Sequence, residues 1–415
     1  MKASVIVVVH AGAHHLDDSL GSLTRYSDRS DVEVILVDNG SADGCGEAAK
    51  RRFPWVRVIR SDTNTGFAGG VHLGAAAATG EVLVLLNDDA AADEDIVEAH
   101  LETLAAHPHA AASAGRLLTW DGKRHDFVRG VVTFDCHAFQ VGQGFPTAEV
   151  DLPAAGEAMP FACGGNMAIR REDWVRSGGF DRELFAYFED VDLGWRLWAT
   201  GREVVACPDA AARHRGAATS GGLGDFRRGV LYERNALRTF HACADDECRA
   251  AFGSVVYATF LHRLAAFASE RPDLERAVSD PFSEGGDSAS LQGRWARRVR
   301  ETGWVASARH LLARIALGPR AGSPALEDGF LLMQLRAAKG FFAGLDGTEK
   351  RGAELQMQRT VPDREILARF PRMVVPTYAG DEEWFASDTF ASLLPAGWPL
   401  EFTKIGQIMR QQTVT

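Results

Sequence analysis

The chain has 415 residues, enough for two domains, of which 46% are apolar and 24% charged. This composition excludes a disordered chain, a collagen-like chain and a small disulfide scaffold. The formal net charge is −11, from 45 Lys and Arg against 56 Asp and Glu, so general nucleic-acid binding, which needs a basic surface, is disfavoured. Six scattered cysteines without a C-x-x-C pair indicate free thiols in a reducing cytoplasm.

Hydropathy along the chain predicts no membrane span. The N-terminus runs straight into a strand-like segment at 5–9, without the small-residue cleavage pattern of an export signal. The most apolar long stretch, 251–268, is interrupted by His262 and Arg263. We therefore expect a cytoplasmic protein.

Strand-like and helix-like segments alternate in the first 90 residues, a pattern typical of a parallel sheet. The expected strands there are 4–9, 32–37, 56–59 and 82–86, and the expected helices are 16–26 and 66–79. The pattern then loosens, and the later expected elements are strands at 131–134, 138–141, 164–170 and 203–206 and a helix at 188–200.

Composition changes near residue 245, which predicts an α/β domain at 1–245 and a mostly helical extension at 246–415. A Ser-, Gly- and Asp-rich linker is expected near 279–293. Residues 294–320 hold seven arginines, one acid and interleaved tryptophans, a basic amphipathic pattern that can lie on an anionic membrane surface. The alternative is a helix that packs its apolar face on the first domain.

Polar residues follow each of the four expected N-terminal strands. They are His10, then Asp38 and Asn39, then Asn64 and Gly66, and finally Asn87, Asp88 and Asp89. Because ligands bind outside the carboxyl ends of parallel strands, these residues are expected to line one crevice. Taken alone, Asp38 is equally consistent with a turn.

The adjacent carboxylates Asp88 and Asp89 indicate a cation site. Two acids after an apolar strand are costly unless they are solvated or bind a cation. Oxygen ligands suit Mg²⁺ or Mn²⁺, which usually complete their shell with ligand phosphates. The alternative is an N-terminal cap for a helix at 90–100, a role that fits Asp88 better than Asp89.

A second acidic cluster opens the helix expected at 188–200. Glu189 and Asp190 fall in its first turn, where the helix dipole stabilises negative charge, so they are either caps or a general base. Asp192 and Arg196 are i,i+4 partners and form a structural pair. His214 is one of 13 histidines, and a lone histidine is most often structural, but an imidazole beside carboxylates can also bind a metal.

Motifs of other nucleotide-binding and hydrolytic folds do not occur in this sequence. There is no G-x-G-x-x-G after the first strand, no P-loop and no G-x-S-x-G elbow. A nucleotidyltransferase would carry a Gly-rich loop with Arg and Lys after the first strand, and residues 10–15 lack one.

Taken together, the segments resemble glycosyltransferase family 2, the inverting nucleotide-sugar transferases of GT-A fold, and within it the rhamnosyltransferase-like branch. The matching segments are 4–9, 37–44, 64–70, 86–89, 178–196 and 214–235. Asn87 stands where the family has the first Asp of its D-x-D motif, and nothing beyond 245 matches. The resemblance implies a Rossmann-like, mostly parallel sheet flanked by helices.

The resemblance also implies roles for individual residues. Asp38 would accept a hydrogen bond from a uracil or thymine base. The other donor-binding residues would be His10, Asn39, Asn64, Gly66, Asn87, Asp88, Gly164 and Gly165. Asp89 and His214 would hold Mn²⁺ or Mg²⁺ on the diphosphate. Asp190 would be the general base, with Glu189 as the second choice.

We therefore expect an inverting glycosyltransferase that moves a sugar from a dTDP- or UDP-sugar, dTDP-rhamnose among them, to a hydroxyl of a glycan or lipid-linked glycan in polysaccharide or glycoconjugate assembly. The alternative is a catalytically silent nucleotide-sugar-binding or scaffolding module. Peripheral contact with the inner face of the cell membrane would use 294–320. The sequence leaves the oligomeric state open.

Overall fold

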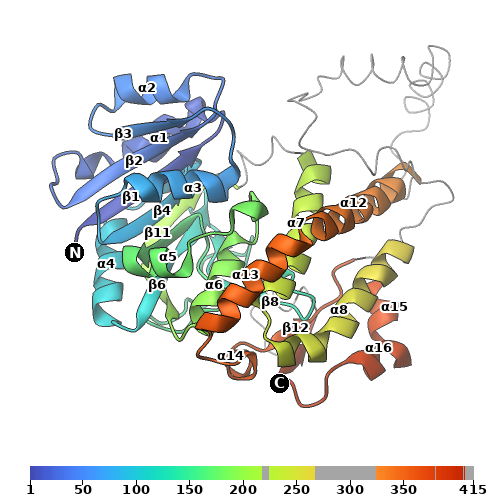
Figure 1. Cartoon of the computed structure of the whole chain (residues 1–415). Helices are drawn as coiled ribbons and strands as arrows, with labels where there is room; N and C mark the ends of the chain where they lie inside the picture. The colour runs from blue at the N-terminus through green and yellow to red at the C-terminus, as the bar shows by residue number, and fades with distance from the viewer. Residues whose placement is uncertain (217–223, 267–323, 379, 405, 407–415) are drawn as a thin grey trace, which may run out of the picture.

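The computed structural model describes residues 1–216, 224–266, 324–378, 380–404 and 406 (Figure 1). The linker expected near 279–293 and the basic amphipathic stretch 294–320 lie outside the described residues.

A nine-stranded sheet forms the centre of the α/β region, with the order β3-β2-β1-β4-β10-β6-β11-β5 and with β7 paired to β6. Strands β1 to β4, β6 and β11 run in one direction, whereas β5, β7 and β10 run in the other. The bounds are β1 (Ala3–Val9), β2 (Val32–Asn39), β3 (Arg57–Ser61), β4 (Val82–Asn87), β5 (Ala90–Ala92), β6 (Ala110–Thr119), β7 (His125–Phe127), β10 (Asn166–Arg170) and β11 (Glu203–His214). The predicted mostly parallel sheet is confirmed, and its antiparallel strands make it mixed. A separate hairpin consists of β8 (Arg129–Val132) and β9 (Ala138–Val141).

Helices cover the sheet on both faces, which is why β1 and β4 are apolar and buried along nearly their whole length. Helix α3 packs on β1 and β2, α4 on β6 and β11, and α6 on β11. The helices of this region are α1 (Leu16–Ser22), α2 (Cys45–Arg52), α3 (Gly66–Ala77), α4 (Ile96–Ala106), α5 (Arg171–Ser177) and α6 (Glu189–Ala199), with 3-10 turns η1 (Ala13–His15), η2 (Thr24–Tyr26) and η3 (Arg182–Leu184).

Two expected helices differ from the structure. The helix expected at 16–26 ends as α1 at Ser22, where the Ser22 hydroxyl donates to the Ser19 carbonyl, and the chain continues as the 3-10 turn η2. No helix begins at residue 90, because Ala90 pairs with His214 in the sheet and α4 starts only at Ile96. Asp88 and Asp89 are therefore not helix caps.

The C-terminal half is mainly helical, as predicted, and its helices gather at the side of the sheet far from β3 (Figure 1). Its elements are α7 (Gly224–Cys243), α8 (Asp246–Ala266), α12 (Pro324–Ala343), α13 (Leu345–Gln358), α14 (Asp363–Arg369), α15 (Asp381–Phe385) and α16 (Asp388–Leu393), with the short parallel pair β12 (Arg372–Val374) and β13 (Leu400–Phe402). One hydrophobic cluster contains both Val7 of β1 and Phe252 of α8. The domain boundary near residue 245 stays a prediction.

A buried ionic cluster ties the C-terminal helices to the β8–β9 hairpin. The Arg263 guanidinium of α8 lies 2.6 Å from an Asp135 carboxylate oxygen and 2.9 Å from one of Asp381. His137 lies 3.2 Å from Asp135 and 3.3 Å from Glu233 of α7. All five side chains are buried. Because unpaired buried charges are costly, these contacts hold the two regions in one arrangement.

None of the helices within the described ranges combines the length and the apolar character needed to cross a bilayer. All six cysteines are free thiols, as the sequence predicts.

Replacing Arg263 with Met is expected to destabilise the protein by about 3–5 kcal/mol, because it leaves the Asp135 and Asp381 carboxylates buried without their cation. The free energy of unfolding from urea titration measures the change. The control is Arg249→Met, which removes an arginine paired with the exposed Asp246 and should cost no more than about 1 kcal/mol. Equal losses in both variants would contradict the role given to Arg263.

His137 predicts a pH dependence of stability. Burial lowers its pKa, but Asp135 and Glu233 outweigh that and raise it to about 9. The resulting stabilisation is fully present below the unfolded pKa of about 6.5 and is lost as pH rises through about 9. The free energy of unfolding of the wild type should fall between pH 7 and pH 10, and that of His137→Gln should fall by less. The exposed-residue control, His109→Gln, should follow the wild type.

Candidate active site at the carboxyl edge of the sheet

Strand register brings the predicted polar residues to one edge of the sheet. Val8 of β1 pairs with Asn87 of β4, and Val9 pairs with Asp38 of β2. His10 follows β1 directly, and its Nδ1 lies 3.0 Å from the Asn39 carbonyl oxygen. The ends of β1, β2 and β4 therefore lie side by side at one edge of the sheet, and the crevice expected there stays a prediction.

Asn39 organises the loop that precedes α3. Its side-chain oxygen accepts from the Thr65 backbone N–H at 3.0 Å and the Thr65 hydroxyl at 2.9 Å. Its Nδ2 donates to the Gly66 carbonyl at 2.9 Å and to Asn64 Oδ1 at 3.2 Å. Gly66 has φ +74°, and a Cβ there would meet the Phe185 carbonyl oxygen at 2.3 Å. Asn39, Asn64 and Gly66 thus form one hydrogen-bonded unit.

Asp38 lies next to this unit, but its side chain is fully buried. Its carboxylate accepts from the Ser41 backbone N–H at 2.9 Å and pairs with the Arg60 guanidinium. The Arg60 side chain is 53% exposed. A nucleobase could reach Asp38 only if Arg60 moved aside, so the predicted base contact stays a prediction.

Asp89 and His214 meet where β4 ends and β11 ends. His214 Nε2 lies 3.0 Å from Asp89 Oδ1 and 3.1 Å from Asn87 Nδ2. The other ring nitrogen, Nδ1, lies 2.6 Å from Asp126 Oδ2 on β7. The imidazole is therefore held between two carboxylates, with one nitrogen facing each. Burial lowers the His214 pKa, but the hydrogen bonds to Asp126 and Asp89 outweigh it and raise the pKa to about 9.

Asp88 is buried beside the turn that follows β1. A Cβ at Gly12 would approach Asp88 Oδ2 to 2.5 Å, so the glycine allows this turn to pass close to the carboxylate. Asp88 and His10 thus lie along the turn at the end of β1.

Asp190 and Glu189 open α6 as predicted, next to segment 163–165. The Gly164 backbone N–H donates to Asp190 Oδ2 at 3.3 Å. A Cβ at Gly164 would meet Phe67 at 2.9 Å, and one at Gly165 would meet Asn87 at 3.0 Å. The two glycines therefore allow one short segment to contact both the acidic helix and the end of β4. Desolvation raises the pKa of the half-buried Cys163 thiol, and the nearby charges of Asp190 and Asp126 raise it further.

The two carboxyl groups of this helix have different protonation preferences. Burial raises the pKa of Asp190 to about 6, opposed by hydrogen bonds from the Val191 and Gly164 backbone N–H groups. Burial and the neighbouring Asp190 charge raise the pKa of Glu189 well above its usual range. The neutral form is therefore favoured more strongly at Glu189 than at Asp190, which makes Asp190 the better candidate for accepting a proton.

The loop before Asp190 has an unusual backbone, which the sequence analysis missed. Phe185, Tyr187 and Phe188 all have positive φ, between 66° and 71°, a conformation that costs energy for residues other than glycine. Asn235 on α7 is buried and donates to the carbonyls of Leu184, Ala186 and Tyr187 at 2.8 to 3.0 Å. These bonds fix the loop that positions the acidic helix.

The pair predicted between Asp192 and Arg196 is confirmed, at 2.6 Å and buried. Arg196 also donates to the carbonyls of Ser177 and Gly179. The Gly178–Asp181 motif is thereby attached to α6, and its Asp181 pairs with Arg238 of α7 at 2.8 Å. These residues support the site and do not line it.

Asp126 is a residue that the sequence analysis missed. It lies on the three-residue strand β7, in a region whose pattern is broken by Gly and Pro, so no periodic signal marked it. Only the fold shows that this carboxylate reaches His214.

Within the described ranges, no cluster of three or more His, Cys, Asp or Glu side chains has the geometry of a metal site. Asp89 and His214 instead offer one carboxylate and one imidazole at the same point, a combination that manganese accepts and that leaves room for phosphate oxygens. The hydrogen bond from His214 Nδ1 to Asp126 is the arrangement usually found behind metal-binding histidines.

Comparison with known proteins agrees with this geometry. Residues 4–174 match the family model described as glycosyl transferase family 2. The N-acetylglucosaminyl-diphospho-decaprenol L-rhamnosyltransferase of Mycobacterium tuberculosis is 30% identical over 237 residues, which are 52% of this chain and 77% of that protein. N-acetylgalactosaminyltransferase 6 of Drosophila melanogaster is 28% identical over 193 residues, 44% of this chain and 29% of that protein.

Among solved structures, a mannosyltransferase of Pyrobaculum calidifontis in complex with GDP-Man and Mn²⁺ is 18% identical, with a TM-score of 0.44, over 82% of this chain and 87% of that chain.

The sheet, its covering helices and the acidic edge define a glycosyltransferase of GT-A fold. The chain belongs to glycosyltransferase family 2. It is an enzyme that transfers a sugar from a nucleotide-sugar donor.

Proposed function

We propose that the chain is an inverting, metal-dependent glycosyltransferase that uses a dTDP- or UDP-sugar, with dTDP-rhamnose as the first donor to test. The observation that supports the proposal is that segment 163–165 contacts Asp190 through Gly164 and approaches Asn87, which neighbours the Asp89–His214 pair, through Gly165. A sugar held over that segment would have the base on one side and the diphosphate on the other. The rhamnosyltransferase name of the mycobacterial relative supports the choice of sugar.

The donor diphosphate would lie over the ends of β1 and β4, next to His10, Asn87, Asp88 and Asp89. Asp89 and His214 would hold Mn²⁺ or Mg²⁺, and the bound ion would neutralise charge that develops on the departing nucleoside diphosphate. Asp126 would keep His214 Nε2 directed at the ion by accepting the Nδ1 hydrogen.

The base end of the donor would lie near Asp38 and the Asn39–Asn64–Gly66 unit. Arg60 would leave Asp38 as the base enters, and Asp38 would then accept the N3–H of uracil or thymine. The Arg60 side chain is 53% exposed and can move into solvent, but Asp38 is fully buried, so the incoming base would have to replace the lost ion pair with its own hydrogen bond.

Asp190 would act as the general base in a single displacement. It accepts the proton of the acceptor hydroxyl while that oxygen bonds to the anomeric carbon and the bond from that carbon to the diphosphate breaks. The acceptor attacks the face opposite the leaving group, so the configuration inverts. Hydrogen bonds from Gly164 and Val191 fix the carboxylate, and Asn235 fixes the loop before it.

We propose a hydroxyl of a glycan or lipid-linked glycan as the acceptor, and polysaccharide or glycoconjugate assembly in the cytoplasm as the setting. The name of the mycobacterial relative, with its diphospho-decaprenol acceptor, supports the lipid-linked form. Six free thiols fit a reducing compartment.

Replacing Asp190 with Asn should lower kcat by 10²-fold or more, while dTDP or UDP binding stays within about threefold, because the amide cannot accept the proton. The matched variant Glu189→Gln should keep most of the activity, since burial and the Asp190 charge favour the neutral form of Glu189 and Gln has the same shape. Turnover measured with a panel of dTDP- and UDP-sugars, together with nucleotide binding by calorimetry, separates the two. No turnover by the wild-type chain with any sugar of the panel would favour the scaffolding alternative, whereas unchanged turnover in Asp190→Asn would show that Asp190 is not the base.

Replacing Asp126 with Asn should weaken Mn²⁺ binding about 10- to 100-fold, because His214 loses the carboxylate that orients its ring. Bound Mn²⁺ is counted by electron paramagnetic resonance in the presence of UDP or dTDP, so the result does not depend on turnover. Asp121→Asn, which changes an exposed acid in the same part of the chain, is the control and should bind Mn²⁺ like the wild type. If Asp126→Asn binds Mn²⁺ normally, the ion does not depend on this histidine arrangement.

A further inference from the structure

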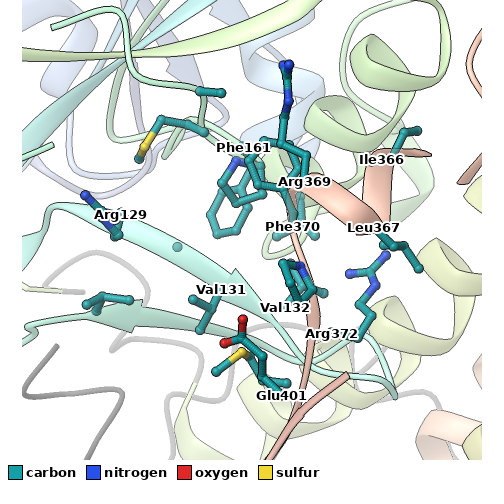
Figure 2. Close-up of a pocket in the computed structure, with 18 of the residues that line it drawn as sticks. Arg129, Val131, Val132, Phe161, Ile366, Leu367, Arg369, Phe370, Arg372 and Glu401 are labelled. Atoms are coloured by element: carbon teal, nitrogen blue, oxygen red, sulfur yellow. The ribbon is translucent and has the colours of Figure 1, made fainter. Parts of the chain in front are cut away.

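A cavity of about 810 Å³ lies between the catalytic region and the C-terminal segment (Figure 2). One wall is the face of α6 that carries Val191, Trp195 and Trp198, spaced at i, i+4 and i+7. The other walls are the β8–β9 hairpin, residues 157–161, residues 366–373 and the end of the chain at 401–403. The volume is in the range of sites that bind small molecules. None of the residues predicted or described above as binding the donor or the metal lines it.

The inner surface of the cavity is largely apolar and aromatic. Its apolar lining includes Val131, Phe161, Trp195, Trp198, Leu367 and Phe370. Two of its arginines already have acidic partners, since Arg129 lies 3.0 Å from Glu157 and Arg369 lies 3.6 Å from Glu203. The polar lining is confined to a few side chains, among them Arg129, Glu157, Arg369 and Glu401, and the aromatic and aliphatic side chains make up most of the exposed wall. A hydrocarbon body matches them.

Arg372 is the exception among these arginines. It is only 6% exposed, and its guanidinium stacks on the Trp195 ring at 4.2 Å from the ring centroid. No carboxylate of the described residues pairs with it, and its side chain makes no hydrogen bond to them. The comparably buried Arg263 has two carboxylate partners, which shows how this fold satisfies an arginine that is purely structural. An arginine that lines the cavity and has no carboxylate partner is available to pair with an anion bound there.

We propose that this cavity binds an amphipathic anion, a hydrocarbon chain that carries one phosphate or carboxylate group, with Arg372 as its charge partner. The aromatic and aliphatic walls would cover the hydrocarbon, and the guanidinium, held flat by Trp195, would donate two parallel hydrogen bonds to the anionic group. Val191 lines the cavity and directly follows Asp190, so the bound molecule would sit beside the helix that carries the base. The inference concerns ligand binding and does not rest on the proposed reaction.

Calorimetric titration of the full chain, without nucleotide or metal, tests this site. The probes are decyl phosphate and decanoate, with 1-decanol and inorganic phosphate for comparison, all below their aggregation limits. At least one of the two anionic probes should bind about tenfold or more tightly than decanol. Inorganic phosphate should not bind measurably, because it lacks the hydrocarbon. The tighter of the two anionic probes identifies the head group.

Arg372→Met should reduce the affinity for the anionic probes to within about threefold of that for decanol, because Met keeps the apolar contact with Trp195 and removes the charge. The matched control is Arg364→Met, which removes an arginine that stacks on Trp398 and pairs with Glu247 outside the cavity, and it should bind like the wild type. Ala158→Phe, which places a large side chain in the cavity and leaves Arg372 intact, should weaken binding of all alkyl probes and keeps the test available if Arg372→Met does not fold.

The proposal is overturned if the wild-type chain binds neither anionic probe, or binds decanol as tightly as both. It is also overturned if folded Arg372→Met retains wild-type affinity, or if Ala158→Phe does so.

Discussion

The active site depends on one constraint, the register of the central strands. Pairing of Val8 with Asn87 and of Val9 with Asp38 brings the polar ends of β1, β2 and β4 level. Strand β11 brings His214 to the same edge. It extends past residue 206, where the sequence predicts its end, and pairs with β5. A shift of one residue in any of these pairings would turn the side chains to the other face of the sheet. The chemistry of the edge therefore rests on apolar strands that never touch a substrate.

The sequence predicted the parts of the fold whose pattern is strong. β1 and β4 are continuous apolar runs, and α6 has a clear amphipathic period, so their positions were predictable to within one or two residues. β6 was not predicted, because its Ala-rich sequence lacks the branched and aromatic residues that mark strands. The short strands β5 and β7 are held only by their neighbours in the sheet.

The site residues also divide into those that a strong local sequence pattern predicts and those that no local pattern predicts. Asp38 and Asp89 lie at or just after the ends of recognisable strands, and Glu189 and Asp190 open a recognisable helix, so their positions could be expected. Asp126 and Asn235 act on His214 and on the loop 184–187 through contacts between distant parts of the chain. No local pattern encodes such contacts, since they exist only once the sheet and α7 have come together.

The contacts that join the C-terminal region to the rest of the chain determine how much of the chain must be present for it to fold. Asp363 accepts from the Trp195 indole at 2.7 Å, and Arg263 neutralises Asp135, so groups on the catalytic side have their partners more than 100 positions later. A fragment that stopped at residue 245 would contain the whole sheet edge, yet it would expose one face of α6 and leave Asp135 and His137 without Arg263. Buried charges in the extension therefore set the shortest chain that can fold into an active enzyme. The length of the region with sequence similarity to relatives does not.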